Sequence, residues 1–167
     1  AARQDSDHFV TYHKDITSLL SSVEIYNSNN ELVYETKYGT GLKEVTVGEN
    51  CRIVFVFEEN EYNQFSPGNN DILTYQMPSN LSAAVVGSGI IRNRNNTIVA
   101  NYQIENDQLR ITPVLVNGKN FFGDFNNVSL AIEFDAEVMY TQDSTSTNID
   151  FHGNFNVTVN MNQDTKI

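Results

Sequence analysis

The sequence predicts an all-β chain folded as a β-sandwich, with at most one or two short helical turns. Three observations predict this class. Apolar residues alternate with polar residues in many short runs, which is the period of half-buried strands. Clusters of Asn, Gly and Asp separate these runs and are typical of turns. Helical periodicity is nearly absent, and the abundant Asn, Thr, Ser and Val favour strands and turns.

The first half of the chain contains four runs with strand patterns. Asp15 is expected to cap a short helical turn that precedes them, over Asp15–Ser21. Val45 and Val47 lead to a turn at residues 48–50. The expected strands are Val23–Tyr26, Glu31–Glu35, Cys51–Phe57, and Ile72–Met77, which stops at Pro78.

The second half continues the same alternation. Asn106-Asp107 and Asn117-Gly118 are strong reverse-turn dipeptides. A second short helical turn is expected around Phe121–Asn126. The expected strands are Leu81–Val86, Gly89–Arg92, Thr97–Ile104, Leu109–Val116, Ser129–Tyr140 and Phe151–Met161.

Length and hydropathy indicate one globular domain. The chain has 167 residues, 40% of them hydrophobic, which is enough to bury a sizeable core. The expected organisation is a flexible tail over 1–8, one domain over 9–162, and a linker to a following domain over 163–167. No stretch approaches the ~20 apolar residues of a membrane span, so we expect no membrane insertion.

Charge and cysteine content exclude several function classes. The net charge is −11, from 21 acidic and 10 basic residues, and no Lys/Arg cluster exceeds the pair Arg92 and Arg94. Nucleic acid is therefore not an expected partner. The single cysteine, Cys51, excludes an internal disulfide and a multi-cysteine zinc site. It lies in an apolar run, where we expect a buried, unreactive thiol.

Two segments are more specific than a general strand pattern. In Val47–Phe57 a Val-Gly-Glu turn opens a strand, and in Asn70–Leu81 an Asn-Asp-Ile-Leu-Thr-Tyr-Gln-Met-Pro-Ser-Asn-Leu run ends a strand at a proline. They resemble the N-terminal subdomain of Gram-positive cell-surface adhesins, the collagen-adhesin and fibrinogen-binding group, and related modules of pilin-like surface proteins. The resemblance covers roughly residues 15–160 and extends to Leu130–Val138 and Phe155–Val159. Asn70 stands where that pattern has glycine.

The resemblance implies an immunoglobulin-like sandwich with Greek-key connections, in a secreted parent protein attached to the cell wall. It implies a non-catalytic adhesin domain that needs no cofactor and serves in host attachment and virulence. The implied partners are a host or extracellular-matrix protein, or a surface glycan, and an adjacent immunoglobulin-like domain of the same chain. Two alternatives remain open: a structural spacer of a surface stalk or pilus, and a carbohydrate-binding module.

Candidate ligand-binding residues are sought in the irregular segments, because exposed aromatic residues in loops can anchor a partner. Such residues can equally pack a loop onto the core. The candidates are Tyr62, Gln64, Phe65, Phe121 and Phe122. No paired carboxylates, nucleophile motif or metal-ligand spacing indicates catalysis or a metal site.

Many proteins of the resembled group carry a Lys–Asn isopeptide bond beside a buried carboxylate. The corresponding candidates are Lys14, Asp135 and Asn156, with Asn154 as the alternative amide. Strand alternation places the apolar residues of 130–138 on the core side and Asp135 on the solvent side. The same count turns Asn154 and Asn156 outward, so the sequence disfavours the bond.

Overall fold

Strands dominate the structure, a computed structural model that describes residues 13–59, 71–79, 81–82, 88–92, 96–105, 107–115, 117–118, 129–138, 145–152 and 155–162. The expected tail over 1–8, the linker over 163–167 and the helical turn at Phe121–Asn126 lie outside these residues. Within them, the helical element is the 3₁₀ turn Thr17–Leu19. A helical turn is therefore present in the expected segment, but it is shorter than Asp15–Ser21, because the strands His13–Asp15 and Leu20–Tyr26 flank it. The N-cap position is Ile16 and not Asp15, although Asp15 Oδ1 accepts the backbone N–H of Thr17 at 2.8 Å.

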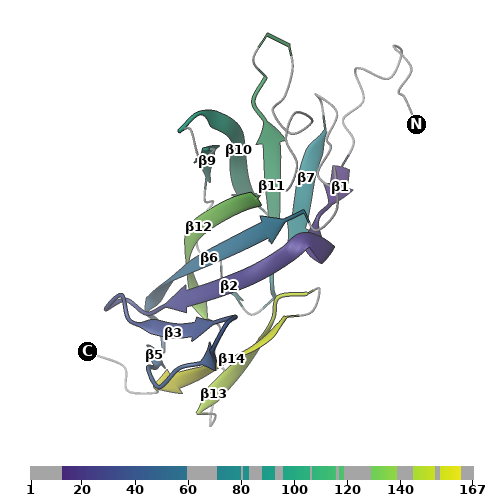
Figure 1. Ribbon diagram of the computed structural model, residues 1–167. Coiled ribbons are helices and arrows are strands. Elements are labelled where there is room, and N and C mark those ends of the chain that lie inside the picture. The colour runs from purple at the N-terminus through teal and green to yellow at the C-terminus, as the bar shows by residue number, and fades with distance from the viewer. Residues whose placement is uncertain are drawn as a thin grey trace.

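The first sheet has five strands in the order β1-β7-β11-β10-β9. The β1 and β7 strands pair in parallel, and the other neighbours are antiparallel. Figure 1 shows this sheet at one end of the molecule. Its strands are β1 (His13–Asp15), β7 (Ile72–Gln76), β9 (Ser88–Arg92), β10 (Ile98–Glu105) and β11 (Gln108–Pro113).

The second sheet has six strands in the order β4-β3-β2-β6-β12-β8, and a third has the order β13-β14-β5. Strands β2, β6 and β12 are neighbours in space but far apart in the sequence, as Figure 1 shows. The second sheet contains β2 (Leu20–Tyr26), β3 (Leu32–Glu35), β4 (Gly39–Thr40), β6 (Asn50–Glu58), β8 (Leu81–Ser82) and β12 (Ser129–Val138). The third contains β5 (Val45–Thr46), β13 (Ser146–Asp150) and β14 (Asn156–Asn162).

The expected all-β class is confirmed, and most expected strands appear within a few residues of their predicted bounds. Strand β13 was not expected, and the prediction of a strand beginning at Phe151 was wrong, because the chain turns there and β14 begins at Asn156. The expected Leu81–Val86 strand is described only as β8. Both expected turns have left-handed backbones, with φ 62° at Asp107 and φ 53° at Asn117.

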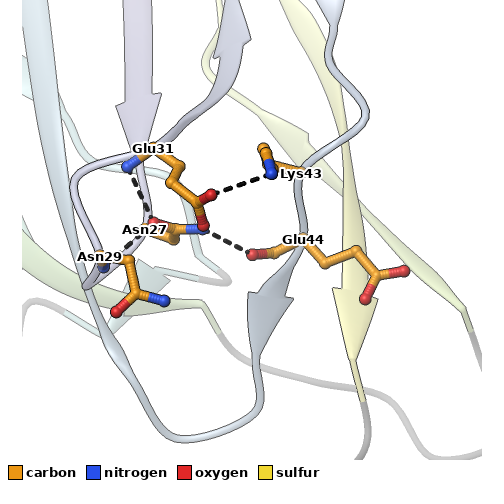
Figure 2. Close-up of polar contacts among 5 residues, drawn as sticks. All are labelled: Asn27, Asn29, Glu31, Lys43 and Glu44. Carbon is orange, nitrogen blue, oxygen red and sulfur yellow. Dashed lines mark hydrogen bonds and ion pairs between the residues drawn. The ribbon is translucent and has the colours of Figure 1, made fainter.

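Asn27 organises the turn between β2 and β3. Its side chain is only 6% exposed, and its Oδ1 accepts the backbone N–H groups of Asn29 and Glu31. Its Nδ2 donates to Glu31 Oε1 at 3.0 Å and to the carbonyl oxygen of Glu44 at 3.1 Å. Lys43 Nζ lies 3.0 Å from Glu31 Oε2 (Figure 2). The turn therefore holds the segment before β5 against the connection between β2 and β3.

Phe55 lies at the centre of the core, because alternate residues of β6 point inward. Its ring centroid is 5.2 Å from that of Tyr75 on β7, 5.0 Å from Phe134 on β12 and 5.5 Å from Phe151, which follows β13. All four rings are buried. This aromatic cluster therefore joins the inner faces of all three sheets.

Tyr75 adds a polar contact to this cluster. It is 0% exposed, and its hydroxyl donates to the carbonyl oxygen of Phe151 at 2.5 Å. Burial raises the pKa of Tyr75, because the phenolate would lose its hydration. Burial likewise raises the pKa of Cys51 to about 12. Both groups stay protonated in the folded protein at neutral pH.

We predict that Tyr75→Phe destabilises the protein by about 1–3 kcal/mol, because the buried carbonyl oxygen of Phe151 loses its donor. Urea unfolding followed by circular dichroism measures this. Tyr34→Phe is the matched control, since Tyr34 also packs on the core and its hydroxyl has no hydrogen bond among the described residues. Equal unfolding free energies for Tyr75→Phe and the wild type would contradict the assigned role.

We predict that stability falls at alkaline pH. In the unfolded chain Cys51 and Tyr75 ionise near their ordinary pKa values of 9.0 and 10.0, whereas burial raises both pKa values in the folded protein. Their contribution is complete below pH 9 and is lost as pH rises, by at most about 1.4 kcal/mol per pH unit for each group. Urea titrations at pH 7, 9 and 10.5 test this. Tyr75→Phe should show a shallower decline above pH 10, and a flat profile from pH 9 to 11 would refute the assignment.

Candidate functional site

A hollow of about 510 Å³ lies over β9, β10 and β11 of the first sheet. Side chains on the solvent face of these strands form most of its lining, since they alternate with the buried residues Ile91, Ala100 and Ile111. Gly89 and Tyr102 also line it. The solvent-face residues of the hollow are Ser88, Ile90, Asn101, Gln103 and Thr112.

Strand register brings these residues together from separate parts of the chain. Asn101 is paired with Ile90 on one side and with Thr112 on the other, and Gln103 is paired with Ser88. Residues directly opposite on neighbouring strands share a face and have Cβ atoms about 5 Å apart. Pairing with both neighbours also uses the main-chain groups of β10, so β10 presents side chains to solvent and no free strand edge.

Gly89 makes room for the Tyr102 ring beneath the hollow. A Cβ atom at Gly89 would lie 2.6 Å from Cε1 and from the hydroxyl oxygen of Tyr102, closer than non-bonded contact allows. The Tyr102 hydroxyl donates to the carbonyl oxygen of Glu133 at 2.9 Å and so ties β10 to β12. Burial, followed by the charge of Glu133, raises the pKa of Tyr102. The ring thus fixes the floor of the hollow to the second sheet.

The polar side chains of the hollow have no hydrogen-bond partners among the described residues. In the described part of the chain, no hydrogen bond involves the side chain of Ser88, Asn101, Gln103 or Thr112. Elsewhere on β7, β9 and β11, polar side chains do have partners. Gln76 Nε2 donates to the carbonyl oxygen of Asp107, the Arg92 guanidinium donates to the carbonyl oxygen of Asn96, and Arg110 Nε donates to Gln108 Oε1. The hollow therefore concentrates free neutral donors and acceptors.

The arrangement is suited to binding through hydrogen bonds and contacts with Ile90, which is 49% exposed. Across the described ranges, no group of three or more His, Cys, Asp or Glu side chains is placed to hold a metal ion. Cys51, whose thiol was expected to be buried, is 0% exposed, and its raised pKa disfavours the reactive thiolate. No helix within the described residues is long and apolar enough to cross a membrane.

The five loop candidates, Tyr62, Gln64, Phe65, Phe121 and Phe122, lie outside the described residues. Sequence reasoning missed the hollow. Its one local signal is the alternation of Asn101 and Gln103 with the core residues of β10, which occurs on any strand with a solvated face. The register that adds Ser88, Ile90 and Thr112 is a long-range property.

The isopeptide candidates lie on strands of three different sheets. Lys14 is partly buried on β1, opposite Leu73 of the first sheet. Asp135 on β12 and Asn156 on β14 are both exposed, on the faces that the alternation predicted. Asn154 lies outside the described residues. The exposed carboxylate of Asp135 differs from the buried carboxylate that such a bond requires.

Comparison with solved structures gives two matches with closely similar scores. The collagen adhesin (CNA) from S. aureus superposes with a TM-score of 0.52 and 13% identity, over 93% of this chain and 47% of the adhesin. The serine-rich repeat adhesion glycoprotein Srr1 from Streptococcus agalactiae has a TM-score of 0.52 and 16% identity, over 91% of this chain and 49% of that one. This chain has the fold of bacterial surface adhesins. It spans about half the length of each structure. No protein-family model and no curated protein matches the sequence.

The adhesin-type fold confirms the resemblance drawn from Val47–Phe57 and Asn70–Leu81 at the level of architecture. Those segments contain β6 and β7, which carry Phe55 and Tyr75 of the aromatic cluster. At 13% and 16% identity the likeness concerns the fold, and binding residues do not transfer.

We predict that Gly89→Ala destabilises the protein by about 1–3 kcal/mol, because the new methyl group must displace a ring held by its bond to Glu133. Chemical denaturation measures the change, with Ser88→Ala as the neighbouring control. In a Tyr102→Ala background, Gly89→Ala should cost much less, since the obstructing ring is gone. An equal cost in both backgrounds would show that Tyr102 does not occupy this space.

Proposed function

We propose that this chain is a non-catalytic ligand-binding domain of a bacterial surface adhesin, and that it binds a host or extracellular-matrix protein. The observation that carries the proposal is the fold match, which covers 93% and 91% of the chain in two proteins whose names describe adhesion. The parent protein would be extracellular and attached to the cell wall. An adjacent domain of the same parent would supply further contacts, since the chain spans only about half of each adhesin.

The hollow favours binding over a spacer role. A spacer gains nothing from a depression whose polar side chains are left without partners, whereas a binding surface uses such groups for its ligand. The sheet beneath is rigid, because β10 is hydrogen-bonded on both sides and tied to β12 through Tyr102. Binding to a preformed surface avoids most of the entropy cost of ordering it.

The net charge of the chain also favours some classes of binding partner over others. The net charge of −11 favours encounter with basic matrix proteins over anionic polymers, and the preference weakens as salt screens the field. Electrostatic attraction of this kind raises the association rate more than the affinity. Shape and hydrogen bonding at the contact surface would then decide which partner remains bound.

We predict saturable binding of the domain to one member of a panel of immobilised collagens, fibrinogen and fibronectin, measured by biolayer interferometry. Heat-denatured domain is the negative control. Tyr62→Ala or Phe65→Ala should weaken binding about tenfold if the segment between β6 and β7 carries the contact, and Gln103→Ala should do so if the sheet face carries it. If none of these proteins binds at concentrations up to the solubility limit, the result would contradict the proposal and favour a role as a structural spacer.

A further inference from the structure

We propose that the hollow over β9, β10 and β11 binds a neutral saccharide. The inference rests on the proposed function, because it assigns a ligand class to one surface of the domain. It also has three observations of its own. Within the described residues, the polar side chains of the hollow make no hydrogen bonds, no charged residue lines it, and the aliphatic side chain of Ile90 is exposed there.

The hydrogen-bonding groups match sugar hydroxyls. Asn101 and Gln103 each carry an amide oxygen that accepts and an amide nitrogen that donates two hydrogens, and Ser88 and Thr112 carry hydroxyls that do both. Vicinal hydroxyls of a pyranose likewise donate and accept at once. Asn101 and Gln103 are two residues apart on one strand, which places their Cα atoms about 7 Å apart on the same face. That span suits groups at opposite sides of one sugar ring.

We expect a neutral ligand because the described residues that line the hollow are all uncharged. No Asp, Glu, Lys or Arg is found among the described residues that line it. The nearest cation is Arg110, which lies opposite Gln103 but outside the lining, with its Nε donating to Gln108 Oε1 at 2.9 Å. A sialylated or sulfated sugar would meet at most this one exposed guanidinium, and the net charge of −11 would oppose its approach.

Ile90 supplies the apolar part of the contact. It is one of the few large apolar side chains in the described residues that remain well exposed, at 49%. The C–H face of a pyranose can pack on it while the hydroxyls reach Asn101 and Gln103. The hollow, of about 510 Å³, is open to solvent, so a saccharide would lie across the sheet face and keep one side in water.

A peptide is the competing occupant, and two observations disfavour it here. Protein partners are gripped by exposed aromatic or arginine anchors. Among the described residues that line the hollow, the aromatic side chain is Tyr102, and its hydroxyl is bonded to the carbonyl oxygen of Glu133. An extended peptide gains most of its affinity from main-chain hydrogen bonds to a strand edge, and the edge nearest the hollow is that of β9, the last strand of the sheet. A peptide paired with that edge would lie beside β9 in the plane of the sheet, and not over Asn101 and Gln103 of β10. The saccharide needs only side chains, which are the groups available.

The test is an array of neutral oligosaccharides, free of sialic acid and sulfate, with sialylated and sulfated counterparts beside them. Strong array signals are then titrated by isothermal calorimetry. Wild type should bind a subset of the neutral sugars. Gln103→Ala should raise the Kd about five- to tenfold, since one or two hydrogen bonds are lost, and Asn101→Ala with Gln103→Ala should raise it further.

Gln76→Ala is the matched control, because Gln76 is exposed on β7 of the same sheet outside the hollow. It should bind like the wild type, and equal melting temperatures would show that all variants are folded. The inference is overturned if no neutral sugar binds, if only charged sugars bind, or if Gln103→Ala binds as tightly as the wild type.

The same variants separate this inference from the proposed function. Matrix-protein binding that survives Gln103→Ala, without any sugar binding, overturns the saccharide site and leaves the adhesin proposal intact. Matrix-protein binding lost in Gln103→Ala, again without sugar binding, assigns the hollow to a peptide. Sugar binding through the hollow with a silent protein panel supports the saccharide site and overturns the protein partner.

Discussion

The packing of Phe55 against Tyr75, Phe134 and Phe151 is the contact on which the architecture depends. A sandwich must bury one face of each sheet, and here three sheets meet on one cluster of rings. The Tyr75 hydroxyl satisfies the buried carbonyl oxygen of Phe151 and so fixes the position where β13 turns toward β14. Apolar packing alone would permit sliding, whereas a directional hydrogen bond specifies one arrangement.

A second contact of an aromatic residue, that of Tyr102 with β12, links the first sheet to the second away from the central cluster. Tyr102 crosses the space left by Gly89 and reaches the main chain of β12. Strand β10, which carries Asn101 and Gln103, is thereby held to β12, and β12 also contributes Phe134 to the aromatic cluster of the core. This link to the core restrains the first sheet, although the side chains on its solvent face have few partners among the described residues.

The strands that could be predicted from the sequence are those with a long, uninterrupted alternation of apolar and polar residues. Strands β6 and β12 have four and five inward apolar residues, so their class, bounds and faces were accessible without coordinates. Strand β13 was missed because it has only two buried residues, Thr147 and Ile149, among residues that favour turns. The hollow was missed for a different reason. Ser88, Asn101 and Thr112 meet only through strand pairing, and their local patterns match those of any solvated strand face.

The pairing of β6 with β12 bears on how the protein reaches its folded state. Asn50 lies opposite Glu137, and β2 joins the other edge of β6, so the middle of the second sheet is assembled from the start and the end of the domain. Closing such long loops is entropically costly before any contact offsets it, and chains of this topology fold on the slow side, in milliseconds to seconds. An emerging chain can pair β6 with β12 only after residue 138 has appeared, and its core is complete only with β14. Until β12 is available, the edge of β6 that pairs with it is free to pair with other chains, and a chaperone bound there during synthesis would prevent this.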